Sequence, residues 1–470
     1  MIVDLLLVDV EVGEHVVDVA VTDGRVVAVG SGLEVEPAEV VDGCGGALIP
    51  GLHDHHIHLL ATAAARSSVD LVALGVSSDA QLRDVLHIAS SRLEPGAWLR
   101  VVGYYEAIAG ELTAGLIDSM VSDRPVRVQH RTGVMWVLNS AALRDLAPVL
   151  DRAPHGVERD EHLAPTGRCM RVDGWLREVV PSTTPDVASI AAELRAFGVT
   201  GVTDATPNLH VAQIAALAPA AMMLRVVACT APGLMAPDVP PGLQLGPVKL
   251  LFDDHDAGDL DALVFAVRDA HAHGRTVAVH AVTRAGLAIA VGVFHEAGAR
   301  PGDRIEHGAV VPPDLRSIVR DLGLQVVTQP AFVACRGDDY LRDVEPDDVL
   351  WLWPCGSLLD AGIGVAAGSD APYGPLDPWQ AIRAATERRT ASGRKLGPSE
   401  AISARRALEL YFGSANDPAG PARVVAPGVP ADLCLLHLPL TEALRAPSAD
   451  VVRATWFWRR GAAPTGPDPR

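Results

Sequence analysis

The middle of the chain alternates between short apolar runs and longer stretches of helical composition, and this pattern constrains the fold more than any other feature. Eight of the runs have the composition of buried strands. They span residues 51–58, 199–205, 224–230, 247–252, 276–280, 304–308, 324–329 and 364–370. Helical segments such as 259–273 and 284–297 lie between them. The pattern predicts an α/β fold with a parallel sheet, and eight such units favour a (β/α)8 TIM barrel.

A doubly wound open sheet is the alternative, but the usual G-x-G-x-x-G phosphate loop after the first strand is absent. Residues 60–197 are too long for one connection between a strand and a helix. They contain strand-like pieces at 98–104 and 126–131. They also contain helical pieces at 78–93 and 185–197, the latter with Thr184 placed to cap it. We predict that 60–197 is an insertion after the first barrel strand that caps the active site.

The sequence pattern at both ends of the chain differs from that in the middle. Residues 1–49 and 422–470 consist of short apolar runs separated by glycines, which is typical of antiparallel strands joined by tight turns. We predict that these two segments form one small β-sandwich domain, and that 50–421 forms the barrel. The last ten residues are rich in proline and glycine, which predicts a frayed tail.

Composition excludes several classes of function. The net charge of −19 argues against binding to nucleic acid or to an anionic membrane, and leaves a small molecule as the expected partner. The sequence contains no run of 18 apolar residues, so we expect no membrane span. The segment Met1–Asp4 lacks the basic start of a secretory signal, and the six cysteines form no C-x-x-C pair. We therefore expect a cytoplasmic protein.

A histidine cluster ends the first predicted barrel strand, in the segment His53-Asp54-His55-His56-Ile57-His58. Alternate residues of a strand share a face, so His56 and His58 can converge on one cation, while His53 and His55 face the other way. Imidazole is the commonest protein ligand for metals such as zinc. Taken alone, two such histidines are better explained as partly buried side chains that form hydrogen bonds to backbone carbonyls.

Four more polar residues lie on or at the ends of predicted strands, namely Lys249, His280, His307 and Asp370. Each has an ordinary explanation: a buried histidine, a lysine reaching the rim, an aspartate in a turn. The active sites of TIM barrels lie at the carboxyl ends of their strands, so six such residues at one rim predict a metal site. Lysine occurs only at 249 and 395, which suggests that an amine is needed at Lys249.

Several motifs resemble the amidohydrolase superfamily, and most closely its amidohydrolase 3 or YtcJ-like group. They are residues 48–54 with 56–58, 198–200, 248–250, 279–281, 305–307, 368–372 and 427–433. Residues 123–126 and 138–143 resemble the insertion of YtcJ-like proteins. The similarity extends over nearly the whole chain.

The resemblance implies a site with two divalent metal ions, expected to be zinc. His56 and His58 would bind the more buried ion, and His280 and His307 the second. Lys249 would bridge both ions as a carbamate (N6-carboxylysine), because a free ammonium cannot act as a ligand. Asp370 would bind the first ion and carry the proton. A single-metal enzyme with unmodified Lys249 remains an alternative.

The expected activity is a hydrolysis of a carbon–nitrogen bond, in a non-peptide amide or cyclic amide, by a metal-bound hydroxide. The alternatives are an esterase or deaminase of the same fold, and a non-catalytic scaffold. Substrate contacts are predicted at Tyr105, Arg131, Trp136 and Arg336. The resemblance is also compatible with a homodimer. The chain departs from the family pattern at His53 and His55, at Val134 and in residues 282–284.

Overall fold

The computed structural model describes residues 1–180, 185–234, 238–252 and 258–458. Thr184 and the predicted tail at 461–470 lie outside these ranges. The described chain divides into two compact units, one of residues 1–59 and 187–470 and one of residues 60–186. Each unit is described by itself.

Eight parallel strands form the centre of the first unit, which confirms the predicted TIM barrel. In sheet order they are β19 (Val365–Ala367), β18 (Gln325–Thr328), β17 (Arg304–His307), β16 (Val277–Ala281), β15 (Leu243–Leu250), β14 (Arg225–Thr230), β13 (Val199–Asp204) and β6 (Leu52–Ile57). Two backbone hydrogen bonds close the ring between its last and first strands. Asp370 N donates to His56 O at 2.7 Å, and His58 N donates to Ala371 O at 3.0 Å.

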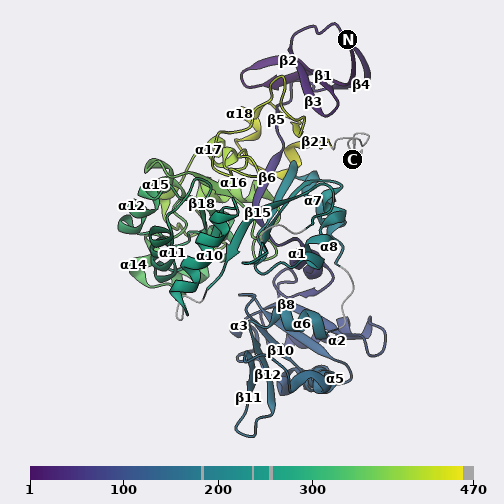
Figure 1. Cartoon of the computed structure of the whole chain (residues 1–470). Helices are drawn as coiled ribbons and strands as arrows, with labels where there is room; N and C mark the ends of the chain where they lie inside the picture. Colours follow the sequence, from purple (N-terminus) through teal and green to yellow (C-terminus); the bar gives the residue numbers. More distant parts are fainter. Residues whose placement is uncertain (181–184, 235–237, 253–257, 459–470) are drawn as a thin grey trace. The chain divides into compact units, whose positions relative to one another are not determined.

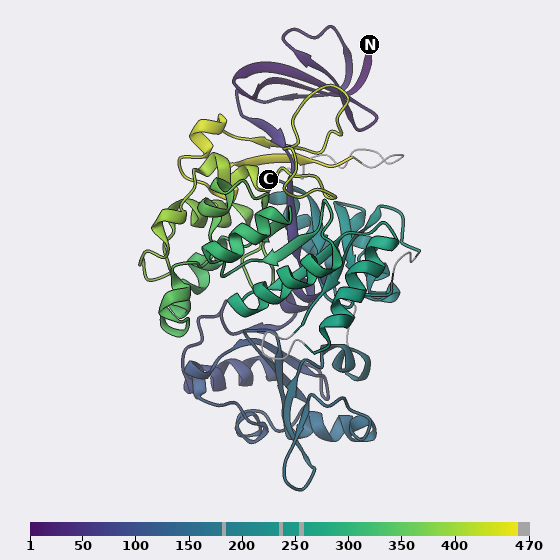
Figure 2. The same ribbon diagram turned by 60° about the vertical axis from the view of Figure 1, so that its left-hand side comes forward.

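Helices follow most of the barrel strands and lie outside them (Figures 1 and 2). Asp259 and Thr283 cap the two that follow β15 and β16, because their side chains accept backbone N–H groups of the first turn. The helices are α7 (Val187–Ala196), α8 (Val211–Ala216), α9 (Ala218–Ala221), α10 (Leu260–Ala272), α11 (Arg284–Ala297), α12 (Pro313–Asp321), α13 (Ala331–Asp343), α14 (Pro346–Val349), α15 (Cys355–Asp360), α16 (Pro378–Glu387), η1 (Pro398–Glu400) and α17 (Ala404–Glu409).

Strands from both ends of the chain form two small sheets in the first unit. The first has the order β3 (Arg25–Gly30), β2 (His15–Thr22), β1 (Ile2–Val12) and β4 (Glu36–Asp42), and β4 pairs parallel with β1. The second has the order β21 (Val452–Trp456), β20 (Leu433–Leu436) and β5 (Leu48–Pro50), with α18 (Leu440–Ala443) and η2 (Ala449–Val451) between its later strands. Leu5, Leu7 and Val19 share one apolar cluster with Leu433 and Trp456, so the two sheets bury a common core.

The second unit begins within α1 (Leu59–Arg66) and contains a six-stranded mixed sheet. The strands in order are β11 (Val157–Arg159), β12 (Pro165–Met170), β10 (Met135–Leu138), β9 (Val126–His130), β8 (Leu99–Tyr104) and β7 (Val69–Asp70). The other helices are α2 (Asp79–Ser91), α3 (Glu106–Ala109), α4 (Ala114–Asp118), α5 (Ser140–Leu150) and α6 (Asp173–Val179). The prediction that this segment caps the active site stays a prediction, as do the predicted domain boundaries.

Asn139, in one of the motifs that resemble YtcJ-like proteins, connects two elements of this unit. Its buried side chain accepts hydrogen bonds from Val126 N and Ala142 N, each at 2.9 Å, and donates to Val121 O and Arg124 O. One amide thus caps α5 and ties it to β9.

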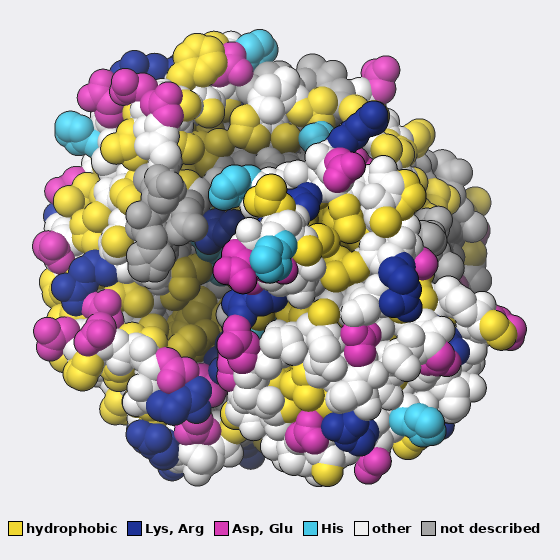
Figure 3. Space-filling view, turned by 90° about the horizontal axis from the view of Figure 1, so that it is seen from below, with side chains coloured by type: hydrophobic (Ala, Val, Ile, Leu, Met, Phe, Trp, Pro, Cys, Tyr) yellow, Lys and Arg dark blue, Asp and Glu magenta, His cyan; other side chains and the backbone are white. Residues whose placement is uncertain are grey.

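Acidic, basic and apolar side chains are interspersed on the face drawn in Figure 3. Within the described ranges, every helix is too short or too polar to cross a bilayer.

Candidate metal centre

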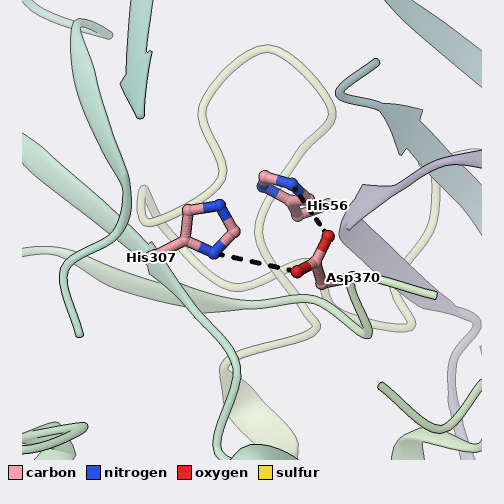
Figure 4. A group of neighbouring side chains, drawn as sticks. All are labelled: His56, His307 and Asp370. Carbon is pink, nitrogen blue, oxygen red and sulfur yellow. Dashed lines mark ion pairs between the residues drawn. The ribbon is translucent and has the colours of Figure 1, made fainter. Parts of the chain in front are cut away.

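Three of the predicted ligands meet in one buried group at the ends of the barrel strands. His56 comes from β6, His307 ends β17, and Asp370 follows β19. Figure 4 shows the Asp370 carboxylate facing both imidazole rings, with an ion pair drawn to each. One possible ligand atom from each of the three residues lies within 4.8 Å of the others. Residues more than 300 positions apart are therefore brought to one point by the closure of the barrel.

The spacing of these atoms suits a single cation. Zinc binds nitrogen and oxygen ligands at about 2.0–2.2 Å, so two ligand atoms in a tetrahedral site lie about 3.3 Å apart. The distance from His56 Nε2 to Asp370 Oδ1 is 3.4 Å, and that from His58 Nε2 to the same oxygen is 3.0 Å. His307 Nδ1 is 4.0 Å from Asp370 Oδ2. The first two separations fit directly. The third does not, and because His307 Nδ1 also bonds to Gln329 Oε1 at 2.8 Å, His307 would bind a cation through its other nitrogen, Nε2.

Burial without hydrogen-bond partners points to the same position. His56 Nε2, Asp370 Oδ1 and Lys249 Nζ are buried and have no hydrogen-bond partner among the described residues. Buried polar atoms are nearly always satisfied in folded proteins, so such a group calls for an explanation. A cation bound between the imidazoles and the carboxylate would satisfy the first two atoms, and the residues present fit a metal of the zinc type.

The other predicted ligands lie next to this group. The ring of His280, on β16, lies with its centroid 4.6 Å from that of His307. Lys249, on β15, is buried and has its Nζ 3.9 Å from Glu306 Oε1. All six sequence-predicted positions are therefore gathered at one end of the barrel. Their individual roles as ligands stay predictions.

A close approach of two backbones sets the position of Asp370. Gly368 lies so near β6 that a Cβ there would be 2.5 Å from His56 N and 2.7 Å from His56 Cβ. Asp370 itself has a φ of 52° and His307 a φ of 72°, in the left-handed region that non-glycine residues rarely adopt. Such conformations cluster at functional sites, where the surrounding structure holds them in place.

The charge states of Asp370, His307 and His280 favour metal binding near neutral pH. Burial alone would raise the pKa of Asp370, but the neighbouring imidazoles of His56 and His58 hold it well below its usual range. Burial and the charge of His56 lower the pKa of His307 to about 3. Burial likewise lowers the pKa of His280 well below its usual range. The carboxylate is therefore ionised and the imidazoles of His280 and His307 are neutral, which are the states in which these groups bind metals. Burial alone would lower the pKa of His56, but Glu306 outweighs this effect and raises it, so a bound cation would have to displace a proton from that ring.

Hydrogen bonds on the far side of each ring fix its orientation. His56 Nδ1 contacts Glu306 Oε2, and His307 Nδ1 bonds to Gln329 Oε1 at 2.8 Å. His58 Nδ1 bonds to Thr206 Oγ1 at 3.1 Å. Sequence reasoning assigned no role to Glu306. The signal was present, because Arg304 and Glu306 are two charged residues on one face of a short, fully buried strand.

His53 and His55 take no part in the group. Their rings lie 4.5 Å apart, and His53 Nε2 bonds to Thr203 Oγ1 at 2.9 Å. The pairing of β6 with β13 shifts register between Asp54 and Ile57, so β6 has one extra residue there. This bulge interrupts the simple alternation of faces expected from the sequence.

The four predicted substrate contacts lie in both units. In the second unit, the guanidinium of Arg131 lies 4.4 Å over the ring of Tyr105. Trp136 is buried, has Arg100 and Arg127 each 5.3 Å from its ring, and donates from Nε1 to an oxygen of Asp173 at 2.9 Å. In the first unit, Arg336 on α13 lies 4.9 Å over Phe332. Packing already accounts for the position of Trp136, and substrate contact by any of the four stays a prediction.

A family model and several known proteins are similar to this chain. A family model described as "Amidohydrolase family" matches residues 39–458. The N-substituted formamide deformylase of Arthrobacter pascens is 25% identical over 458 residues, which cover 84% of each chain. YtcJ of Bacillus subtilis (strain 168), named as an amidohydrolase, is 23% identical over 427 residues, 78% of this chain and 79% of that one.

Among solved structures, an uncharacterized metal-dependent hydrolase from Pyrococcus horikoshii superposes with a TM-score of 0.74. The alignment has 21% identity and covers 95% of this chain and 98% of that one. This likeness supports the fold.

Proposed function

The chain belongs to the amidohydrolase family and is a hydrolase, and on this basis we propose that it cleaves the carbon–nitrogen bond of an N-substituted amide or a cyclic amide. The observation that carries the proposal is the buried group of His56, His307 and Asp370, with its unsatisfied ligand atoms. The likeness to a deformylase of N-substituted formamides supports an amide over an ester.

We propose that His56, His58 and Asp370 hold one zinc ion and that His280 and His307 hold a second. A divalent cation bound there would lower the pKa of a water molecule toward 7 and polarise a substrate carbonyl. The geometry that supports this is the contact of both histidines of the first set with Asp370, and the packing of His280 against His307. A single ion held by His56, His307 and Asp370 is the simpler arrangement.

Asp370 is the residue proposed to move the proton. Its carboxylate is ionised, because the contacts with His56 and His58 outweigh the effect of burial on its pKa. It can therefore accept a proton from the attacking water and return it to the leaving nitrogen, acting first as a general base and then as a general acid. Proton transfer by a positioned side chain of this kind contributes about 10²–10⁴-fold to the rate.

Lys249 is proposed to become a carbamate. Burial lowers the pKa of Lys249, although Glu306 opposes this effect, so the neutral amine is more accessible than in water. The neutral amine is the form that adds to carbon dioxide: nitrogen forms the new bond to carbon, one proton leaves, and an anionic carboxylate results. Two anionic oxygens at this position could bridge two cations, which an ammonium cannot do.

A hydrolysis screen with defined metal content tests the proposal. The purified chain, loaded with Zn²⁺, is assayed on N-substituted formamides, lactams, carbamates, esters and amino-substituted heterocycles. We expect amide hydrolysis that is lost on chelation and in His307→Ala. Turnover of esters or release of ammonia alone would reassign the chain to those reactions, and a metal-free chain without any turnover would favour a non-catalytic scaffold.

A cytoplasmic location and a homodimer belong to the same proposal. The location is supported by six cysteines that form no disulfide in the structure. Fractionation of cells and the mass of the protein in solution test these two points.

A further inference from the structure

Glu306 is a fully buried carboxylate in contact with three functional groups. Its Oε1 accepts a hydrogen bond from Arg304 Nε at 2.8 Å and lies 3.9 Å from Lys249 Nζ. Its Oε2 contacts Nδ1 of His56. Glu306 therefore links the residue proposed as a carbamate with a residue proposed as a metal ligand, while lying outside the group that faces the cation itself.

Burying this carboxylate is costly, and the chain compensates for it locally. A buried charge destabilises a protein by several kcal/mol unless it is paired. Arg304 lies two residues earlier on β17, on the same face, and is itself buried. A packed pair of apolar residues would fill the same space without this cost. Packing alone therefore does not explain the presence of a charged pair at this position, whereas a role in the metal site does.

The contact with His56 determines which ring nitrogen faces the cation. When Nδ1 donates its proton to Glu306, the lone pair of the neutral ring is on Nε2. That nitrogen has no hydrogen-bond partner in the described part of the chain and lies 3.4 Å from Asp370 Oδ1. Histidines that bind metals commonly donate their other nitrogen to a carboxylate, which sets the tautomer and the ring orientation.

We propose that Glu306, held in place by Arg304, is a positioning residue that presents Nε2 of His56 to the metal. The inference rests on the proposed metal centre and adds a residue that does not touch the metal. Loss of such a partner typically weakens metal binding about 10–100-fold. The effect is transmitted through His56, so it disappears when His56 is absent.

Zinc affinity measured by competition with a chelator tests the inference. Glu306→Gln keeps the shape of the side chain and removes the charge. We expect it to weaken Zn²⁺ binding about 10–100-fold. Glu400→Gln is the matched control, because Glu400 is also buried in the first unit but bonds to Ser357 N at 2.8 Å, away from the histidines. It should bind Zn²⁺ as the parent chain does.

Two further variants keep the test decisive. Because Glu306→Gln leaves Arg304 buried without its anion, the double variant Arg304→Met with Glu306→Gln removes both charges and should show the same loss of affinity. In a His56→Ala background, Glu306→Gln should have no further effect, which a purely structural role would not produce.

The outcomes separate this inference from the metal centre on which it rests. If His307→Ala weakens Zn²⁺ binding but Glu306→Gln and the double variant bind like the parent chain, the positioning role is wrong and the metal centre stands. If His307→Ala also binds Zn²⁺ like the parent chain, the metal centre is wrong, and the positioning role is wrong with it.

Discussion

Replacing Gly368 with alanine should disturb the metal centre without touching any proposed ligand. The added Cβ would lie 2.5 Å from His56 N, 2.7 Å from His56 Cβ and 2.9 Å from Asp54 Oδ1. Ordinary van der Waals contact begins at 3.4 Å, so relief of the first clash needs the difference between 3.4 and 2.5 Å, which is 0.9 Å. None of the three atoms belongs to a flexible chain end that can move aside cheaply.

The expected effects follow from that displacement. Extra methyl groups in a packed core typically cost about 1–3 kcal/mol, so thermal unfolding of Gly368→Ala should begin at a lower temperature. Functional groups must stay within about 0.5 Å of their working geometry, and the displacement exceeds this limit. Because Gly368 lies two residues before Asp370, the shift changes the distance between His56 and Asp370. We expect Zn²⁺ affinity to fall at least about tenfold.

Gly292→Ala is the control for this experiment. Gly292 lies within α11, is exposed, and would have no atom within 4 Å of an added Cβ. Alanine there should stabilise the chain by about 0.5–1 kcal/mol and leave Zn²⁺ binding unchanged. If Gly368→Ala unfolds and binds Zn²⁺ like the parent chain, the close approach of β19 to β6 does not set the geometry of the site.

Three further predictions concern other parts of the chain. Asp370→Asn should lower kcat on the best amide substrate by about 10²–10⁴-fold, and near-full turnover with an unchanged metal content would refute its role in proton transfer. Burial raises the pKa of Asp54 from 3.8 to about 6, so the fold favours the protonated carboxyl group. This stabilises the metal-free fold fully below pH 3.8, and the stabilisation is lost as the pH rises through 6. In urea unfolding of chelator-treated protein, the free energy of unfolding of Asp54→Asn should therefore rise relative to that of the parent chain, by up to about 3 kcal/mol between pH 4 and 7. A difference that does not change with pH would contradict this. Asn139→Ala removes the side-chain partner of four buried backbone groups. It should destabilise the second unit by on the order of 3 kcal/mol and speed hydrogen exchange of the backbone amides in β9 and α5. Unchanged exchange would show that the Asn139 side chain is dispensable.

Much of the barrel could be predicted because its signals are local. Buried strands appear in the sequence as short apolar runs, and capping residues indicate where helices begin. The segment predicted as helical at 284–297 is α11 with the same bounds, and the segment 259–273 contains α10 with Asp259 as its cap. The gathering of the proposed metal ligands could be predicted because parallel barrel strands bring their carboxyl ends to one rim.

The features that were not predicted depend on contacts between distant segments. Glu306 and His56 lie 250 positions apart, and alternation on a strand predicts a face without naming the partner across the barrel. β4 pairs parallel with β1, although the turn residues before β4 are equally compatible with an antiparallel meander. The bulge in β6 arises from its pairing with β13, since nothing in the local sequence marks an extra residue.

The metal content of the purified chain tests the central claim most directly. Elemental analysis of the parent protein should find at least one tightly bound divalent ion per chain. At least one ion should be lost in His307→Ala, whereas the metal content should be unchanged in Glu400→Gln. A parent protein that contains no divalent metal, takes up none on dialysis against Zn²⁺, and still hydrolyses its substrate in the presence of chelator would contradict the account.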